Sequence, residues 1–149
     1  AGMMADLIDG LEINFPSLSS SHKAKVKQTL NDYVEVDNPL DYHTFIWGDR
    51  KRTSECFSAM MSGQFAATML LLDWPKSKES EQKDWDATLF ALSDALSGTS
   101  EKAIVLASMA DCMPKRIIEE CLSLGIAPMV GLDVCLKARN QYYKIGRAF

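Results

Sequence analysis

The chain has 149 residues, of which 47% are hydrophobic and 24% charged, and its formal net charge is -4. This length supports one domain with a buried core, and the composition is that of an ordinary globular protein. A nucleic-acid partner is not expected, because the two basic stretches, at 23–27 and 50–52, are short. Both are typical of solvated helix faces, although the second also suits a phosphate or a nucleotide tail.

The sequence predicts no membrane span and no metal site. Its longest apolar run, Phe65–Leu72, is far shorter than a membrane-spanning helix, and its first residues lack the basic region of a signal peptide. The cysteines are far apart, without a C-x-x-C pair or a His at metal-ligand spacing. We therefore expect reduced thiols in a cytoplasmic protein. The four cysteines are Cys56, Cys112, Cys121 and Cys135.

Predicted helices and strands alternate along the chain. Helices follow from apolar residues spaced three and four apart, and strands from short apolar runs between turn residues. In chain order the sequence predicts a helix over 2–11, a strand at Leu11–Phe15, a helix over about 21–31, a strand at Tyr33–Val36, a helix between Asp49 and Gly63, a strand at Ala67–Leu72, a helix from Trp85 to Leu96, a strand at Ala103–Ala107, a helix between Pro114 and Gly125, a strand at Ala127–Val130 and a closing helix to about 143.

This alternation predicts a single α/β domain over 1–149, with a mostly parallel sheet between two helical layers, as in flavodoxin-like proteins. The chain opens on a helix, whereas such a sheet normally opens on a strand. We therefore expect the first, central strand to come from a longer parent chain or from another chain. The parent chain is preferred because Ala1 and Gly2 resemble the tail of a glycine-rich turn between a strand and a helix.

The loop of Asn38, Pro39, Leu40 and Asp41 follows the predicted strand Tyr33–Val36. Proline fixes its own backbone angle, and Asn and Asp favour turns, so the loop is expected to be stiff. Ligands of open α/β sheets bind beyond the carboxyl ends of the strands. The alternative is a loop that only covers its own hydrophobic edge.

Several segments together resemble one flavodoxin-like domain of the NDP-forming (ADP-forming) acyl-CoA synthetases, which are relatives of succinyl-CoA synthetase. No single motif is diagnostic, and the order and spacing of the segments carry the likeness over essentially the whole chain. The similar segments are the turn and helix start at 1–6, the Asn-Pro-hydrophobic-Asp loop at 38–41, the apolar strand with its Asp at 67–73, and the strand Gly-Ile-Ala-Pro-Met-Val at 125–130, followed by a helix that contains Ala138.

The resemblance implies a multidomain ligase that interconverts acyl-CoA, ADP and phosphate with free acid, CoA and ATP. The parent enzyme uses CoA, ATP or ADP and Mg, and its partner domains are a CoA-binding domain and an ATP-grasp domain. This chain resembles the second flavodoxin-like domain, which by itself binds no cofactor. The family's phosphorylated histidine lies in a glycine-flanked setting that neither His22 nor His43 matches. No catalytic residue is therefore expected here.

The same resemblance places a phosphate or phosphohistidine at the helix start formed by Gly2 and Met3, where free N–H groups and the helix dipole favour an anion. An ordinary helix start is the alternative. Asp41 would orient a neighbouring loop or accept backbone hydrogen bonds at the rim of this site, or else only form a turn.

Four further residues are weaker site candidates. Asp73 and Trp74 end an apolar strand, and Trp74 would either dock a partner domain or cover the strand end. His43 is a weak candidate for a proton carrier. Cys112 lies just before a helix start, which favours a reactive thiol, but Asp111 beside it opposes thiolate formation.

Three functions stay open on the residues alone. They are a phosphate-site domain of an acyl-CoA synthetase, a small hydrolase that uses Cys112, and a non-catalytic interaction or regulatory module. The sequence fixes neither the acyl substrate nor the nucleotide, and it leaves the assembly open, a homo-oligomer included.

Overall fold

A three-stranded parallel sheet forms the centre of the computed structural model, which describes residues 15–42, 44–63 and 65–136. The strands are β1 (Thr68–Leu71), β2 (Ala103–Ala107) and β3 (Ala127–Val130), in the order β1-β2-β3. Leu70 of β1 lies beside Val105 of β2, which in turn lies beside Pro128 of β3. The predicted α/β class with parallel strands is confirmed, and so are these three strands.

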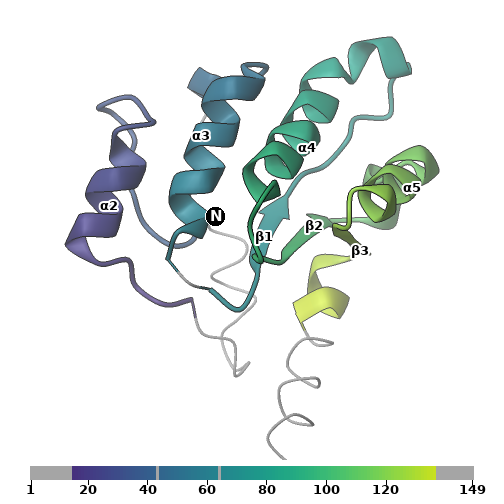
Figure 1. Ribbon diagram of the computed structural model, residues 1–149. Coiled ribbons are helices and arrows are strands. Elements are labelled where there is room, and N and C mark those ends of the chain that lie inside the picture. Colours follow the sequence, from purple (N-terminus) through teal and green to yellow (C-terminus); the bar gives the residue numbers. More distant parts are fainter. Residues whose placement is uncertain (1–14, 43, 64, 137–149) are drawn as a thin grey trace, which may run out of the picture.

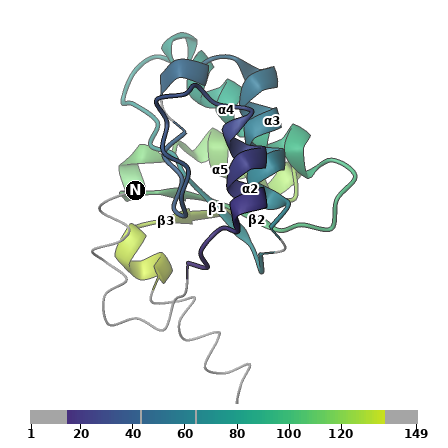
Figure 2. The ribbon, with the colours of Figure 1, turned by 90° about the vertical axis from the view of Figure 1, so that its left-hand side faces the viewer.

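Four helices lie together on one face of the sheet (Figures 1 and 2). Both crossovers, β1 to β2 and β2 to β3, run in the same direction across the sheet, so right-handed connections place α4 and α5 on the same side. Residues 132–136 are helical and lie on the opposite face (Figure 2). The helices are α2 (Ser20–Lys27), α3 (Arg50–Met61), α4 (Lys83–Leu96) and α5 (Lys115–Ser123), and the short 3-10 turns are η1 (Thr44–Ile46), η2 (Glu79–Glu81) and η3 (Ala110–Cys112).

Local sequence signals set the ends of these helices. The hydroxyl of Ser19 accepts a hydrogen bond from the His22 N–H at 3.2 Å, which caps α2. Asp49 caps α3 in the same way through the Arg52 N–H at 3.0 Å, as predicted. After α5, Gly125 has a φ of 71°, a left-handed conformation that glycine adopts without strain.

The core has a layer on each face of β2. Val105 is fully buried against the helical face, with Leu89 and Leu92 of α4 and Ile117 of α5. Leu106, its neighbour in sequence, points the other way and packs with Leu132 and Leu136. A strand that is buried on both faces reads as a continuous apolar run, which is why β2 was recognisable in the sequence.

The predicted strand Tyr33–Val36 is wrong. These residues are turn and irregular backbone, yet their burial alternates: Tyr33 is 91% exposed, Val34 3%, and Val36 7%. A strand also needs the backbone groups of a neighbouring strand, and within the described ranges none pairs with this segment. The alternation therefore reflects burial of every second side chain, with no strand paired to this segment among the residues that the structure describes.

Three other predicted elements fall wholly or partly outside the described residues. The predicted helix over 2–11, residues 11–14 of the first predicted strand, and the closing helix beyond residue 136 lie outside the described residues. β1 is an edge of the described sheet, with β2 as its neighbour.

No helix among the described residues is long and apolar enough to cross a membrane.

The central position of Leu89 yields a stability prediction. Leu89→Ala should lower the free energy of unfolding by about 2–5 kcal/mol, because it leaves a cavity under a fully buried side chain. Leu122→Ala is the matched control: Leu122 is 62% exposed on α5, so its loss should change stability by less than about 0.5 kcal/mol. Urea denaturation measures both, and equal effects would contradict the described core.

Candidate functional site

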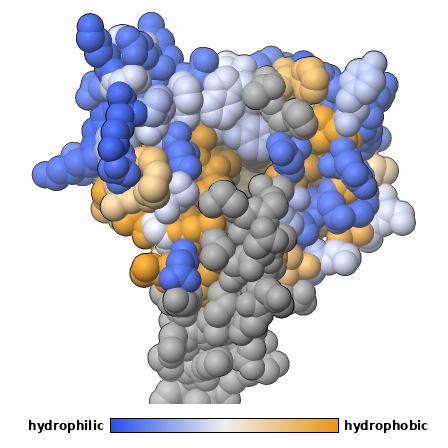
Figure 3. All heavy atoms as spheres, turned by 180° about the vertical axis from the view of Figure 1, so that it is seen from behind, coloured by the Kyte–Doolittle hydropathy of each residue, from blue (hydrophilic) through white to orange (hydrophobic). Residues whose placement is uncertain are grey.

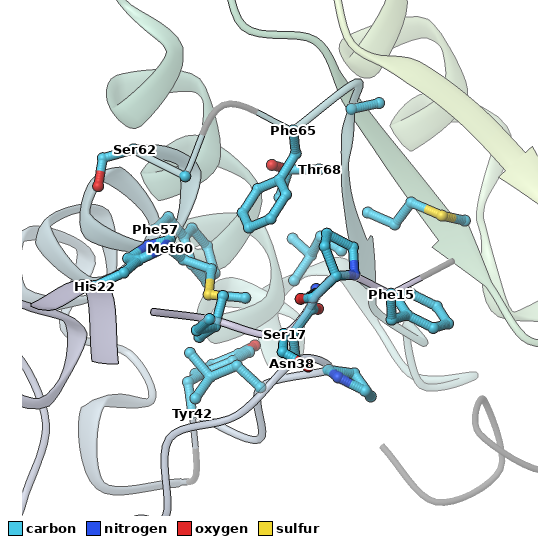
Figure 4. A pocket seen from close by; sticks show the side chains of 18 of the residues that line it. Phe15, Ser17, His22, Asn38, Tyr42, Phe57, Met60, Ser62, Phe65 and Thr68 are labelled. Carbon is cyan, nitrogen blue, oxygen red and sulfur yellow. Dashed lines mark hydrogen bonds between the residues drawn. The ribbon is translucent and has the colours of Figure 1, made fainter. Parts of the chain in front are cut away.

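A groove of about 980 Å³ runs along β1. One wall is the strand itself with the residues before it, 66–71. The other walls come from the segment 15–19, from α2 and α3, and from the loop at 38–42 (Figure 4). Apolar side chains such as Phe57, Met60 and Phe65 point into it, and Ser17, Asn38 and Thr68 add polar groups. Clefts of this size and mixed lining are where proteins bind small molecules or peptide segments.

The Asn38–Asp41 loop lies on this groove rather than at the end of a strand. Asn38, Pro39, Leu40 and Asp41 all line it. The Asn38–Pro39 peptide bond is cis, and the Asn38 side-chain amide donates to the Pro16 carbonyl at 3.0 Å. The loop thus borders a hollow large enough for a ligand. Its predicted location relative to a strand end was wrong, because residues 33–36 form no strand.

Charged groups tie the loop to α2. The Asp37 carboxylate accepts the Asn38 N–H at 3.0 Å and lies 3.3 Å from the Lys23 ammonium. The backbone hydrogen bond from Asn38, and then Lys23, lower the pKa of the Asp37 carboxyl, since both favour its charged form. The pair is exposed, so it orients the loop more than it stabilises the fold.

Tyr42 anchors the other end of the loop. Its ring packs edge-on against Phe57 with centroids 5.3 Å apart, and burial raises the pKa of its hydroxyl well above the ordinary value. Asp41, one residue earlier, has an exposed side chain. The loop therefore holds Asp41 on a backbone that is fixed on both sides.

Asp73 joins the carboxyl ends of β1 and β2. Its carboxylate accepts hydrogen bonds from the Ser108 N–H and the Ser108 hydroxyl, both at 2.7 Å. The two acceptor oxygens thus hold the turn that leaves β2 against the end of β1. Asp73 remains exposed at the edge where α/β proteins bind ligands.

Trp74 is only 1% exposed, so it covers the strand end and presents no docking surface. Its indole N–H donates to the Asp86 carboxylate at 2.9 Å. Asp86 also accepts two hydrogen bonds from the Arg116 guanidinium, at 3.0 and 3.1 Å. These three side chains link the end of β1 with α4 and α5. Of the two roles predicted for Trp74, this burial supports the cover.

Cys112 lies in η3, close to the end of β1. Burial, followed by the charges of Asp73 and Asp111, raises the pKa of its thiol. Lys76 forms an ion pair with Asp111, which lowers the pKa of that carboxyl. The thiol at this strand end is therefore held protonated at neutral pH. This environment is the opposite of the one that activates a nucleophilic cysteine.

His22 is the histidine that the structure describes, and neighbouring groups hold its ring in place. His22 lies on the groove, but its Nε2 is 2.9 Å from the Ala59 carbonyl oxygen and its ring stacks on Phe65. His43, together with the predicted phosphate site at Gly2 and Met3, lies outside the described residues. Across residues 15–42, 44–63 and 65–136, no group of three His, Cys, Asp or Glu side chains is arranged to hold a metal ion.

The sequence singled out the loop at 38–41, but it gave no sign of the other walls of the groove. Its apolar walls come from helix faces that read as ordinary core, and from the segment 15–19, which carries no motif. Ser17 and Leu18, immediately after Pro16, lie against residues that are far away in sequence. Only the tertiary fold brings these parts together. No protein-family model matches this chain, and a search of the curated proteins also found no match.

The environment of Cys112 predicts that its thiol is alkylated slowly. Because its pKa is raised, less thiolate is present at pH 7, and iodoacetamide should alkylate Cys112 no faster than a small model thiol. The rate should increase steadily as the pH is raised toward and beyond the ordinary thiol pKa. Mass spectrometry of timed samples measures it, and labelling faster than the model thiol would contradict the structure.

Two variants control this experiment. Cys112→Ala should leave almost no labelling, since Cys56, Cys121 and Cys135 are buried and burial raises the pKa of Cys121 to about 11. Asp111→Asn should accelerate labelling of Cys112 several-fold, because it removes a negative charge and releases Lys76.

Proposed function

We propose that this chain is a flavodoxin-like module of an NDP-forming acyl-CoA synthetase, in which it helps to shape the site for phosphate transfer. The observation that carries the proposal is the Asn-Pro-Leu-Asp loop, fixed at both ends along a large groove beside a parallel sheet. That loop is one of the segments by which the sequence resembles the family. Two others coincide with β1 and β3.

The proposed reaction joins a free acid to CoA at the expense of ATP, or runs in reverse to make ATP. The acyl group passes through an acyl phosphate, and phosphate then moves to a histidine of another domain. CoA, the nucleotide and Mg would bind to those other domains. Within this module, the helix start that the sequence predicts at Gly2 and Met3 would bind the phosphate, where a helix dipole contributes about 0.3–1 kcal/mol to an exposed anion.

The role proposed for Asp41 follows from its position. It is a negatively charged side chain on an anchored loop, so contact with the phosphate itself is unfavourable. It is better suited to accept hydrogen bonds from the backbone N–H groups of a neighbouring domain. Asp73 at the β1 end and Asn38 on the loop would form the same rim.

A hydrolase based on Cys112 gains no support from the geometry. Its thiol has a raised pKa, and the described His22 is engaged with Ala59 and Phe65. A non-catalytic interaction module would use the same groove as the proposed ligase domain. ATP formation by the natural protein distinguishes these two functions.

The proposal is tested in the full natural protein that carries this sequence. With an acyl-CoA, ADP, phosphate and Mg, we expect ATP formation, measured by a coupled luminescence assay over a panel of acyl chains. Asp41→Ala should reduce this activity at least tenfold, which corresponds to about 1.4 kcal/mol of lost transition-state stabilisation. It should leave the melting temperature within about 2 °C, because the side chain is exposed.

Asp32→Ala is the control for this experiment, since Asp32 is an exposed aspartate outside the loop. Its activity should equal that of the unmodified protein. The proposal fails if no acyl-CoA supports ATP formation. A large fall in melting temperature for Asp41→Ala would instead make that residue structural.

A further inference from the structure

One part of the groove lies on the helical face of β1. Thr68, the first residue of β1, shares a face of the strand with Leu70, because side chains two residues apart point the same way. Leu70 packs in the helical layer with Phe57 of α3, so the Thr68 side chain also faces α3. All three side chains line the groove. This part of the hollow is therefore enclosed between the sheet and the helices.

The hydroxyl of Thr68 is buried and makes no hydrogen bond with the described residues. The Thr68 backbone N–H does have a partner, since it donates to the Lys102 carbonyl at 2.8 Å. Buried polar groups are nearly always paired, because an unpaired one has lost its hydrogen bonds to water without replacement. A hydroxyl can both donate and accept a hydrogen bond. An oxygen atom of a bound molecule would supply the pairing that this side chain lacks.

The walls around this hydroxyl are apolar. Phe57, Met60 and Phe65 point into the groove around Thr68 (Figure 4). Seen from behind, hydrophobic side chains gather in the middle of the molecule and hydrophilic ones lie around them (Figure 3). A molecule that reaches Thr68 must therefore have an apolar body.

Helix α2 brings a positive charge to the groove that the described fold does not use. Two of its three lysines are engaged: Lys23 pairs with Asp37, and Lys27 donates to three backbone carbonyls that follow the helix. The third, Lys25, lines the groove, and its ammonium has neither an ion pair nor a hydrogen bond with the described residues. α2 contains no acidic residue. The α2 wall of the groove is therefore suited to an anion.

The carboxylate of Asp41 also borders the groove, from the loop at 38–42. It repels an anion, so a negatively charged ligand group is expected on the α2 side, away from the loop.

We propose that the groove binds a small monocarboxylic acid whose apolar body carries one hydroxyl or carbonyl oxygen. The carboxylate pairs with Lys25, and the second oxygen forms a hydrogen bond with the Thr68 hydroxyl. An acid without that oxygen leaves Thr68 unpaired and is the poorer ligand, which gives the site its specificity. A hollow of about 980 Å³ has room for such a molecule. This site goes beyond the proposed ligase function, because binding needs neither CoA nor a nucleotide.

Equilibrium binding to the full natural protein that carries this sequence tests the site. Calorimetric titration, without CoA or nucleotide, compares octanoate with a set of hydroxyoctanoates that carry the hydroxyl at successive carbons. The tightest hydroxyoctanoate should bind at least tenfold more strongly than octanoate, since it pairs the Thr68 hydroxyl. Equal affinities, or no binding by any member of the set, would overturn the proposal.

Thr68→Val shows whether Thr68 selects the second oxygen. Valine has nearly the shape of threonine and suits a strand, so the fold and the apolar wall are kept. The preference for the hydroxyoctanoate should disappear, while octanoate binds as before. Thr99→Val, at an exposed threonine that does not line the groove, is the matched control and should change neither affinity. A preference that persists in Thr68→Val overturns the proposal.

Lys25→Gln tests the charge. It should weaken the binding of octanoate and of the hydroxyoctanoate by the same factor, several-fold at low salt, and binding should then lose most of its salt dependence. Lys51→Gln is the control, since Lys51 is exposed on α3 and does not line the groove. Equal effects of the two lysine variants would mean a general attraction of anions and would overturn the proposed site. None of these results depends on ATP formation, so the ligase function is judged separately.

Discussion

The parallel pairing of β2 with both of its neighbours is the constraint on which this molecule depends. It places Val105 and Leu106 in two different apolar layers, although they are adjacent in sequence. Because parallel strands need long crossovers, α4 and α5 are fixed on one face by the same pairing. The ends of β1 and β2 then meet at one edge, and this is why Asp73 can bond to Ser108, 35 residues later in the chain.

Polar side chains at that edge bond to one another. Trp74, Asp86 and Arg116 form a hydrogen-bonded network between β1, α4 and α5. Asp111 pairs with Lys76 and, together with burial, keeps the Cys112 thiol protonated. The polar side chains at the strand ends are thus engaged in hydrogen bonds and ion pairs. The open space lies elsewhere, along the side of β1.

The groove and the sheet edge have a common origin. A parallel strand buried on both faces is stable only when its neighbours supply backbone partners and apolar layers. β1 has both layers but one described neighbour, and residues 33–36 have strand-like burial without a partner ladder. The loop at 38–42 follows this segment directly and lies on the same groove.

The sequence by itself determined the elements whose signals are local. The caps at Ser19 and Asp49, the glycine after α5, and the continuous apolar runs of β1, β2 and β3 all act over a few residues, and each was recognisable without a structure. The resemblance to acyl-CoA synthetases also came from the sequence, through the order of short segments. It stays a proposal here.

Only the tertiary structure decided what depends on distant neighbours. Tyr33–Val36 has the composition and the alternation of a strand, but a strand exists only where another backbone pairs with it. From the sequence, Trp74 would either dock a partner domain or cover the strand end. Its burial, with its N–H bonded to Asp86 of α4, which Arg116 of α5 also contacts, decides for the cover. The groove is formed by stretches that are far apart in the chain, so the loop at 38–41 alone could not show where the other walls lie. Packing, which joins residues far apart in sequence, is the physical reason for this difference.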